Sequence, residues 1–350
     1  MSLIRTAAMA VLTAAAVVGL TAGPALAQKE EGDVTWTVRT ASNSYGADRS
    51  SYSYAVNPGG TLNDAMIVAN RGKTPLALDV YTADGYTTDT GQLDLQVKGA
   101  KPVAVGTWAK PAQVRVTVQP GKTVSVPFAV TVPDNATPGD YVGGIVTSLT
   151  QPDQSQSISV ERRLGIRIKL RVGGDLAPAL SIDNLGINFH GTANPFAAGD
   201  ATVHYTIHNT GNTTLSAQQG VELSGPFGWF KVRAKDIAAP PELLPGETWQ
   251  MSVPLKDVSP AVRLAATATL TPLITDPSGS TSQLATVKAT ASAWAVPWPL
   301  TILVIILVAA VIATIVLTRR NRARRKQRED ARVAEAVQQA LKEKEAQLPA

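Results

Sequence analysis

The chain has 350 residues, of which 44% are hydrophobic and 17% charged; this size and composition allow two or three ordinary domains and exclude a disordered chain. It contains no cysteine and only three histidines, which excludes disulfides, thiol nucleophiles and iron–sulfur clusters and leaves little for metal or acid–base chemistry. The net charge of +5 comes mainly from residues 319–350, with ten basic against five acidic side chains, whereas residues 28–318 are nearly neutral, so we expect no nucleic-acid partner.

Residues 1–27 have the pattern of a secretory signal peptide. Arg5 precedes an apolar run from Ala7 to Leu20, and Ala25-Leu26-Ala27 supplies the small residues of a cleavage site. We expect cleavage after Ala27, so that the remaining chain is exported. An uncleaved anchor helix is the alternative.

Residues 28–173 and 174–295 each predict an immunoglobulin-like β-sandwich, and the fold class is therefore all-β for the exported body. Apolar and polar residues alternate along many short segments, as at Val126, Phe128 and Val130 in the first part and Val203, Tyr205 and Ile207 in the second. Half-buried antiparallel strands need this period of two, because successive side chains point to opposite faces of the sheet. Turn sequences such as Pro-Gly and Asn-x-Gly separate the segments in both halves.

Tyrosines in a polar segment of the first sandwich are candidate ligand contacts. Tyr45 and Tyr52, with Tyr54 nearby, are flanked by Asn, Asp and Arg side chains. Flat rings in such surroundings suit a sugar or a peptide. Packing of one or two of these rings in the core is the alternative.

A basic stripe on one predicted strand is the second candidate site. The strand at residues 164–172 alternates apolar side chains with the basic ones, so the basic side chains share one face. Such a face suits phosphate-rich polymers or peptide carboxylates, or it is simply solvated and protects a sheet edge from aggregation. The residues of the stripe are Arg163, Arg167, Lys169 and Arg171.

Nothing in the sequence nominates a catalytic centre. No phosphate-binding loop, dinucleotide fingerprint or nucleophile elbow is present in the sequence. His204 and His208 share a strand face, but four residues along a strand separate them by ~13 Å, too far for one metal ion. We therefore expect a non-catalytic protein without metal or cofactor.

Residues 296–318 are predicted to form a transmembrane helix. The run from Pro299 to Leu317 is uncharged and, as a helix, spans ~28 Å, about the thickness of the hydrocarbon core. Trp294 and Trp298 lie at one end, and a cluster of arginines and lysine begins at Arg319 at the other. The positive-inside rule then predicts a single-pass type I protein of the cell membrane, with the bulk of the chain extracellular and the C-terminus cytoplasmic.

The tail, residues 319–350, is predicted to be cytoplasmic and to contain an amphipathic helix. Val333, Val337 and Leu341 recur at helical spacing with charged residues between them. The basic cluster before them would be attracted to anionic lipid.

The first sandwich resembles the peptidoglycan-binding domain of the WxL-interacting proteins of Gram-positive bacteria. The stretches that carry the resemblance are Val56–Gly60, Asn70–Gly72, Tyr86–Leu93 and, most specifically, Val118–Gly121 through Ile145. The order of signal peptide, two sandwiches, membrane helix and basic tail also agrees. The resemblance implies that the first sandwich contacts peptidoglycan and the second engages a surface protein partner.

The leading hypothesis is therefore a non-catalytic, membrane-anchored surface protein that binds peptidoglycan and a protein partner. The alternative is an extracytoplasmic scaffold or chaperone for exported proteins, which would bind them by β-strand augmentation. An envelope hydrolase is the third hypothesis, and it would need a pair of carboxylates brought together by the fold.

Overall fold

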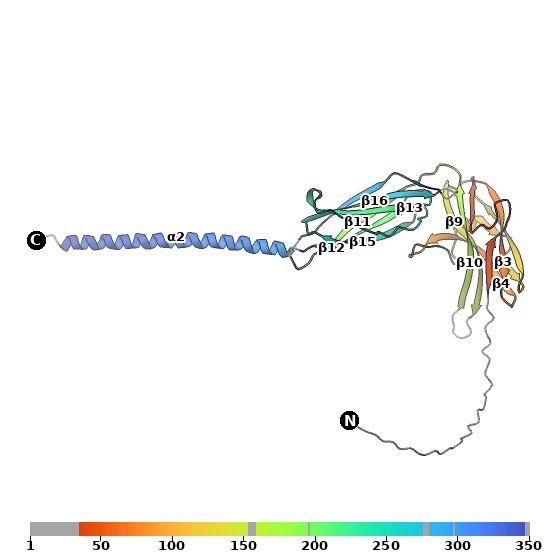
Figure 1. The fold of residues 1–350 in the computed structure, drawn as a ribbon, viewed down its shortest axis with the longest axis horizontal. Coiled ribbons are helices and arrows are strands. Elements are labelled where there is room, and N and C mark those ends of the chain that lie inside the picture. Colours follow the sequence, from red (N-terminus) through yellow and green to blue (C-terminus); the bar gives the residue numbers. More distant parts are fainter. Residues whose placement is uncertain (1–34, 153–158, 195–196, 276–279, 297, 347–350) are drawn as a thin grey trace, which may run out of the picture.

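The chain is mostly β-structure followed by one long helix, which confirms the predicted class at this level (Figure 1). The computed structural model describes residues 35–152, 159–194, 197–275, 280–296 and 298–346. The predicted signal peptide and its cleavage site lie outside the described residues.

The first part of the described chain forms two facing sheets. One has the strand order β1-β3-β8-β6; the other has the order β2-β10-β9-β4-β5, with β7 also paired to β4. Strand β2 runs parallel to β10, whereas β9 runs antiparallel to it. The elements are β1 (Trp36–Thr40), β2 (Tyr52–Val56), β3 (Thr61–Asn70), β4 (Leu76–Thr87), β5 (Leu93–Leu95), α1 (Val105–Trp108), β6 (Ala109–Pro111), β7 (Arg115–Val118), β8 (Thr123–Thr131), β9 (Gly139–Pro152) and β10 (Ser159–Val172).

These two sheets enclose one hydrophobic core. Val126 of β8, Met66 of β3 and Ile168 of β10 are fully buried in it. Ser125, the neighbour of Val126, points to the opposite face and is exposed, as the period of two requires. The alternation in the sequence therefore separates the core face from the solvent face.

A second pair of sheets follows and encloses a core of its own. One sheet has the order β11-β12-β15, and the other has the order β14-β13-β16-β17, with β18 also paired to β16. Ile207, Leu223, Leu264 and Leu270 are almost fully buried between them. The elements are β11 (Leu180–His190), β12 (Gly199–Asn209), β13 (Ser216–Ser224), the 3-10 helix η1 (Pro226–Gly228), β14 (Val232–Arg233), β15 (Thr248–Val258), β16 (Arg263–Thr275), β17 (Thr281–Gln283) and β18 (Val287–Trp294).

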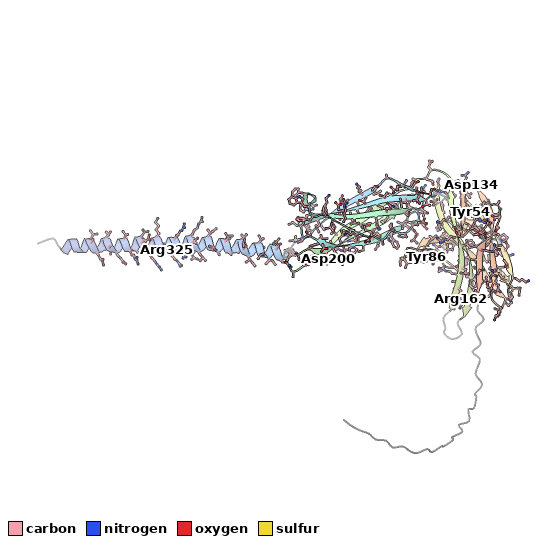
Figure 2. The ribbon with its side chains drawn as sticks, in the orientation of Figure 1. Tyr54, Tyr86, Asp134, Arg162, Asp200 and Arg325 are labelled. Carbon is pink, nitrogen blue, oxygen red and sulfur yellow. The ribbon has the colours of Figure 1, made fainter. Side chains whose placement is uncertain are left out.

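Helix α2 (Trp298–Ala346) is continuous through the predicted membrane segment and the predicted tail. No glycine or proline interrupts it after Pro299, so nothing in the backbone stops the helix where the apolar run ends. Within the described residues it is the one helix long and apolar enough to cross a membrane, and its apolar window is not buried against protein. Arg325 projects from its polar part (Figure 2).

Candidate functional site: an open strand edge and the recess beside it

Strand β10 has an open edge over half of its length. It pairs with β9 along its whole length, from Ser159 opposite Pro152 to Val172 opposite Gly139. On its other side, β2 pairs only with Ile168–Val172. In the part of the chain that the structure describes, no strand covers the edge of Glu161–Arg167. Such an edge presents backbone donors and acceptors to another extended chain.

Leu164 gives this edge an apolar contact. Its side chain is 38% exposed, whereas Ile166 and Ile168, on the same face of β10, are buried. An added strand would place its own side chains beside Leu164, because paired strands keep neighbouring side chains in contact. The sequence does not distinguish Leu164 from the other apolar positions of the strand; only the pairing of β2 does.

The predicted basic stripe lies on the outer face of β10, but two of its members are held in ion pairs. Arg171 donates two hydrogen bonds to Asp140, at 2.6 and 2.8 Å. Arg163 donates to Asp94 at 2.8 Å and also reaches the carbonyl of Leu95. A bidentate or doubly bonded arginine already has its geometry fixed by these partners. These two residues therefore stabilise the fold around them.

The other two members of the stripe are held less firmly. Lys169 lies 3.8 Å from Glu242, and both side chains are about half exposed, so this pair contributes little to stability. Arg167 is exposed and makes no ion pair within the described residues. Arg167 also belongs to the segment of β10 whose edge is open.

A recess of about 380 Å³ lies next to the basic face, between the two sandwiches. Ser53 of β2 and Lys169 of β10 line it from the first sandwich, and Thr214 and Glu242 line it from the second. It therefore offers hydroxyl groups and charges of both signs. An extended segment lying along the edge of β10 would lie end to end with β2, whose first residue pairs with Ile168.

Direct hydrogen bonds hold the two sandwiches together around this recess. Glu247 of the second sandwich accepts from the backbone N–H of Thr87 at 2.8 Å and from its hydroxyl at 2.6 Å. Asp140 accepts from the N–H of Thr214 at 2.9 Å, and its own N–H donates to the carbonyl of Asn212. The recess thus has walls whose separation is set by specific contacts.

The substitution Glu247→Ala is expected to loosen this junction, because each lost hydrogen bond to the carboxylate is worth about 1.5–3 kcal/mol. Since the sequence has no cysteine, two introduced cysteines, one in each sandwich, permit spin-label distance measurements. The distance distribution should broaden in Glu247→Ala and stay narrow in Glu242→Ala. Among the described residues, the Glu242 side chain makes only the long contact with Lys169. Equal distributions in both variants would show that Glu247 does not fix the junction.

The predicted tyrosine site separates into one surface ring and two internal ones. Tyr45 is 47% exposed and packs edge-on against Tyr54, with ring centroids 5.2 Å apart. Tyr52 is fully buried and donates its hydroxyl proton to the carbonyl of Ala65, so it offers no surface to a ligand. Tyr54 is also buried, within the first sandwich (Figure 2).

A buried charged cluster, which the sequence did not indicate, organises this region. Asp64 accepts from Arg49 at 2.8 Å, from the Tyr54 hydroxyl at 2.6 Å and from the Asn43 amide at 2.7 Å. Burial alone would raise the pKa of the Asp64 carboxyl, but the hydrogen bonds from Arg49 and Tyr54 lower it below its usual value. Burial and Asp64 also raise the pKa of Tyr54 well above its usual value, so its hydroxyl remains a donor. The cluster anchors the segment between β1 and β2.

The histidines contribute to local packing on β12. His208 lies 3.4 Å from Asp183 on the neighbouring strand. The His204 ring packs directly over Gly186 and leaves no room for a side chain at that position. Within the described residues, no group of three or more histidine and acidic side chains is placed to hold a metal ion.

Proteins similar to this chain are found among solved structures. No family model and no curated protein matches the chain. Similar structures include the class 5 fimbriae chaperone CfaA (10% identity, TM-score 0.35) and the Escherichia coli chaperone DraB (10%, 0.32). A third is the CsuC–CsuE chaperone–tip complex of Acinetobacter baumannii (13%, 0.34). Each match covers 73% of this chain and 98% of the other. These identities and TM-scores assign no function to the chain.

The resemblance to WxL-interacting proteins is wrong. No family model supports it, and the similar structures named above are fimbrial chaperones. The Pro-Gly turns and alternating strands on which it rested are common to antiparallel sandwiches in general, so they do not identify one family. The expectation of peptidoglycan binding is not supported. The similar structures include fimbrial chaperones, in line with the expected non-catalytic protein.

Proposed function

We propose that this protein is a membrane-anchored, non-catalytic scaffold or chaperone that binds an extended segment of an exported protein by strand addition to β10. The observation that carries the proposal is the edge of Glu161–Arg167, which is paired with β9 on one side and with no described strand on the other. Strand addition needs only such an edge and a client segment with unpaired backbone groups.

Side chains around the edge would select the client. Backbone hydrogen bonds along the edge supply affinity without regard to sequence, and the side chains of alternate client residues supply specificity. Leu164 favours an apolar client residue on the inner face. Arg167 and Lys169 on the outer face favour carboxylates, which arginine binds with two parallel hydrogen bonds.

The membrane anchor in this proposal is α2, and the sandwiches lie on the exported side. The 49-residue helix is ~74 Å long, whereas its 19 uncharged residues account for ~28 Å. The remainder carries the basic cluster that follows Leu317. Because basic clusters remain on the cytoplasmic side, the polar part of α2 would extend into the cytoplasm.

The substitution Leu164→Glu is expected to weaken client binding about tenfold or more, equivalent to at least ~1.4 kcal/mol. It puts a charge beside the client's apolar side chain, while the exposure of Leu164 keeps the effect on folding small. The matched control is Val114→Glu, since Val114 of the same sandwich is 74% exposed and lies outside the open edge.

The client for this measurement is obtained by placing a photo-crosslinking residue at Arg167 in the membrane-bound protein and identifying the captured partner. Purified client is then titrated against the wild type and both variants, and hydrogen exchange is followed in β10. We expect client binding to protect amides within Glu161–Arg167. Equal affinity for Leu164→Glu, together with unchanged exchange in this segment, would exclude strand addition at β10.

A further inference from the structure

The loop between β13 and β14 exposes three aromatic side chains. It has the sequence Gly225-Pro-Phe-Gly-Trp-Phe-Lys231 and contains η1. Phe227 is 92% exposed, Trp229 64% and Phe230 56%. Isolated exposed apolar residues are ordinary, but a contiguous group of large aromatic ones marks a surface that contacts something.

The backbone holds these rings outward. Phe227 and Phe230 have φ angles of 57° and 53°, a left-handed conformation that bulky residues rarely adopt. The loop is closed by a hydrogen bond of 2.7 Å from the Gly225 N–H to the Trp229 carbonyl. At its base, Glu222 accepts from Arg233 at 2.6 Å. Strain of this kind persists only where the surrounding contacts enforce it, and it is found at sites with a function.

The strand register places this loop at the end of the second sandwich where α2 begins. Ser224, the last residue of β13, pairs with Ala265 of β16, and Ala265 also pairs with Ser292 of β18. Strand β18 ends at Trp294, and α2 starts at Trp298. Figure 1 shows α2 leaving from this end of the sandwich. The aromatic loop and the start of the apolar helix are therefore neighbours.

Other apolar side chains at the same end are also exposed. Val262, in the turn before β16, is 56% exposed, and Trp294 and Trp298 are 74% and 69% exposed. The Ala295 N–H donates to the Val262 carbonyl, which joins this turn to the approach to α2. Lys231 ends the loop; its side chain is 58% exposed and lies 3.4 Å from Glu222. Aromatic rings with a cation beside them are the side chains that partition into the headgroup layer.

We infer that Phe227, Trp229 and Phe230 insert into the interfacial layer of the membrane that α2 crosses. The occupant of this surface is lipid, because the loop adjoins the start of the apolar helix, where Trp294 and Trp298 lie at the expected headgroup level. The inference rests on the proposed membrane span of α2. It gives the sandwich a second membrane contact, so that the exported body is held at a fixed inclination instead of rotating about the helix start.

Single cysteines test this contact in the full-length protein, since the native sequence has none. Nitroxide labels are placed at Phe227→Cys, at Ser282→Cys and at Val308→Cys, and the protein is reconstituted in vesicles of phosphatidylcholine and phosphatidylglycerol. Ser282 is exposed in β17, which pairs with the opposite end of β16 from the loop, and Val308 lies in the apolar part of α2. Collisions with oxygen and with a water-soluble nickel complex are measured for each label.

The label at 227 should collide less often with the nickel complex and more often with oxygen than the label at 282 does. The label at 308 should differ from the label at 282 in the same direction. A label at 227 that matches the one at 282, while 308 is protected, would overturn the inference and leave the membrane span intact. Loss of both kinds of collision at 227 would indicate a protein contact and would also overturn it. Free access of nickel to 308 would refute the span itself, and the inference with it.

Discussion

The substitution Val126→Asp is expected to unfold the first sandwich, with a loss of ~4 kcal/mol or more in the free energy of unfolding. Val126 is fully buried in β8 and lies opposite Met66, which is also fully buried. The substitution removes a well-packed apolar side chain and leaves a carboxylate without a partner in the core. Denaturant titration followed by tryptophan fluorescence measures the loss, since Trp36 is buried in the same core.

The matched control is Ser125→Asp in the same strand. Ser125 is exposed on the opposite face of β8, so the same new charge should change stability by no more than ~0.5 kcal/mol. Because both variants add the same charge to the same strand, the difference between their stabilities reports only which face of β8 carries the new carboxylate. Similar losses in both variants would contradict the assignment of faces in β8.

The substitution Asp64→Asn is expected to cost ~3–5 kcal/mol, because it leaves Arg49 as a charge without its partner in a site of low solvent access. The side chain of Asp64 is fully buried and that of Arg49 is 14% exposed. Asparagine also lacks the second oxygen that accepts from Tyr54 and Arg49. Asp89→Asn, at an exposed position of the same sandwich, is the control and should be nearly neutral.

The pH dependence of this difference provides an independent measurement. Because the pKa of Asp64 is lower in the folded than in the unfolded state, its contribution is complete above the unfolded value of about 3.9 and is lost as the pH falls through the folded value. The difference in unfolding free energy between the wild type and Asp64→Asn should therefore shrink with acidification below about pH 4. A difference that stays constant down to low pH would show that the Asp64 charge does not stabilise the fold.

Part of the candidate site follows from the sequence. The alternation along residues 166–172 correctly predicts which side chains of β10 are internal, and it places Arg167 and Lys169 on the outer face. Leu164 continues the same pattern but is exposed, because β2 does not reach it. It could not predict that Arg163 and Arg171 are held by Asp94 and Asp140, because these acids come from β5 and β9. Whether a basic side chain of β10 is held in an ion pair depends on the acidic residues that the fold places beside it.

The aromatic residues show the same limit. The polar neighbours of Tyr52 leave a ligand contact and core packing as alternatives, and the parallel pairing of β2 with β10 places the ring in the core. Phe227, Trp229 and Phe230 form an obvious apolar run in the sequence, yet only the register of β13, β16 and β18 places that run beside the start of α2.

The sequence by itself determined the strand periodicity, the long apolar helix and the basic cluster that follows it, because each of these is a property of residues close together in the chain. The tertiary structure decided that the edge of Glu161–Arg167 is open, that a recess forms beside Lys169, and that the aromatic loop adjoins α2. These features arise from hydrogen-bonded pairing between segments far apart in the chain, and alternation gives each strand its two faces without specifying its neighbours.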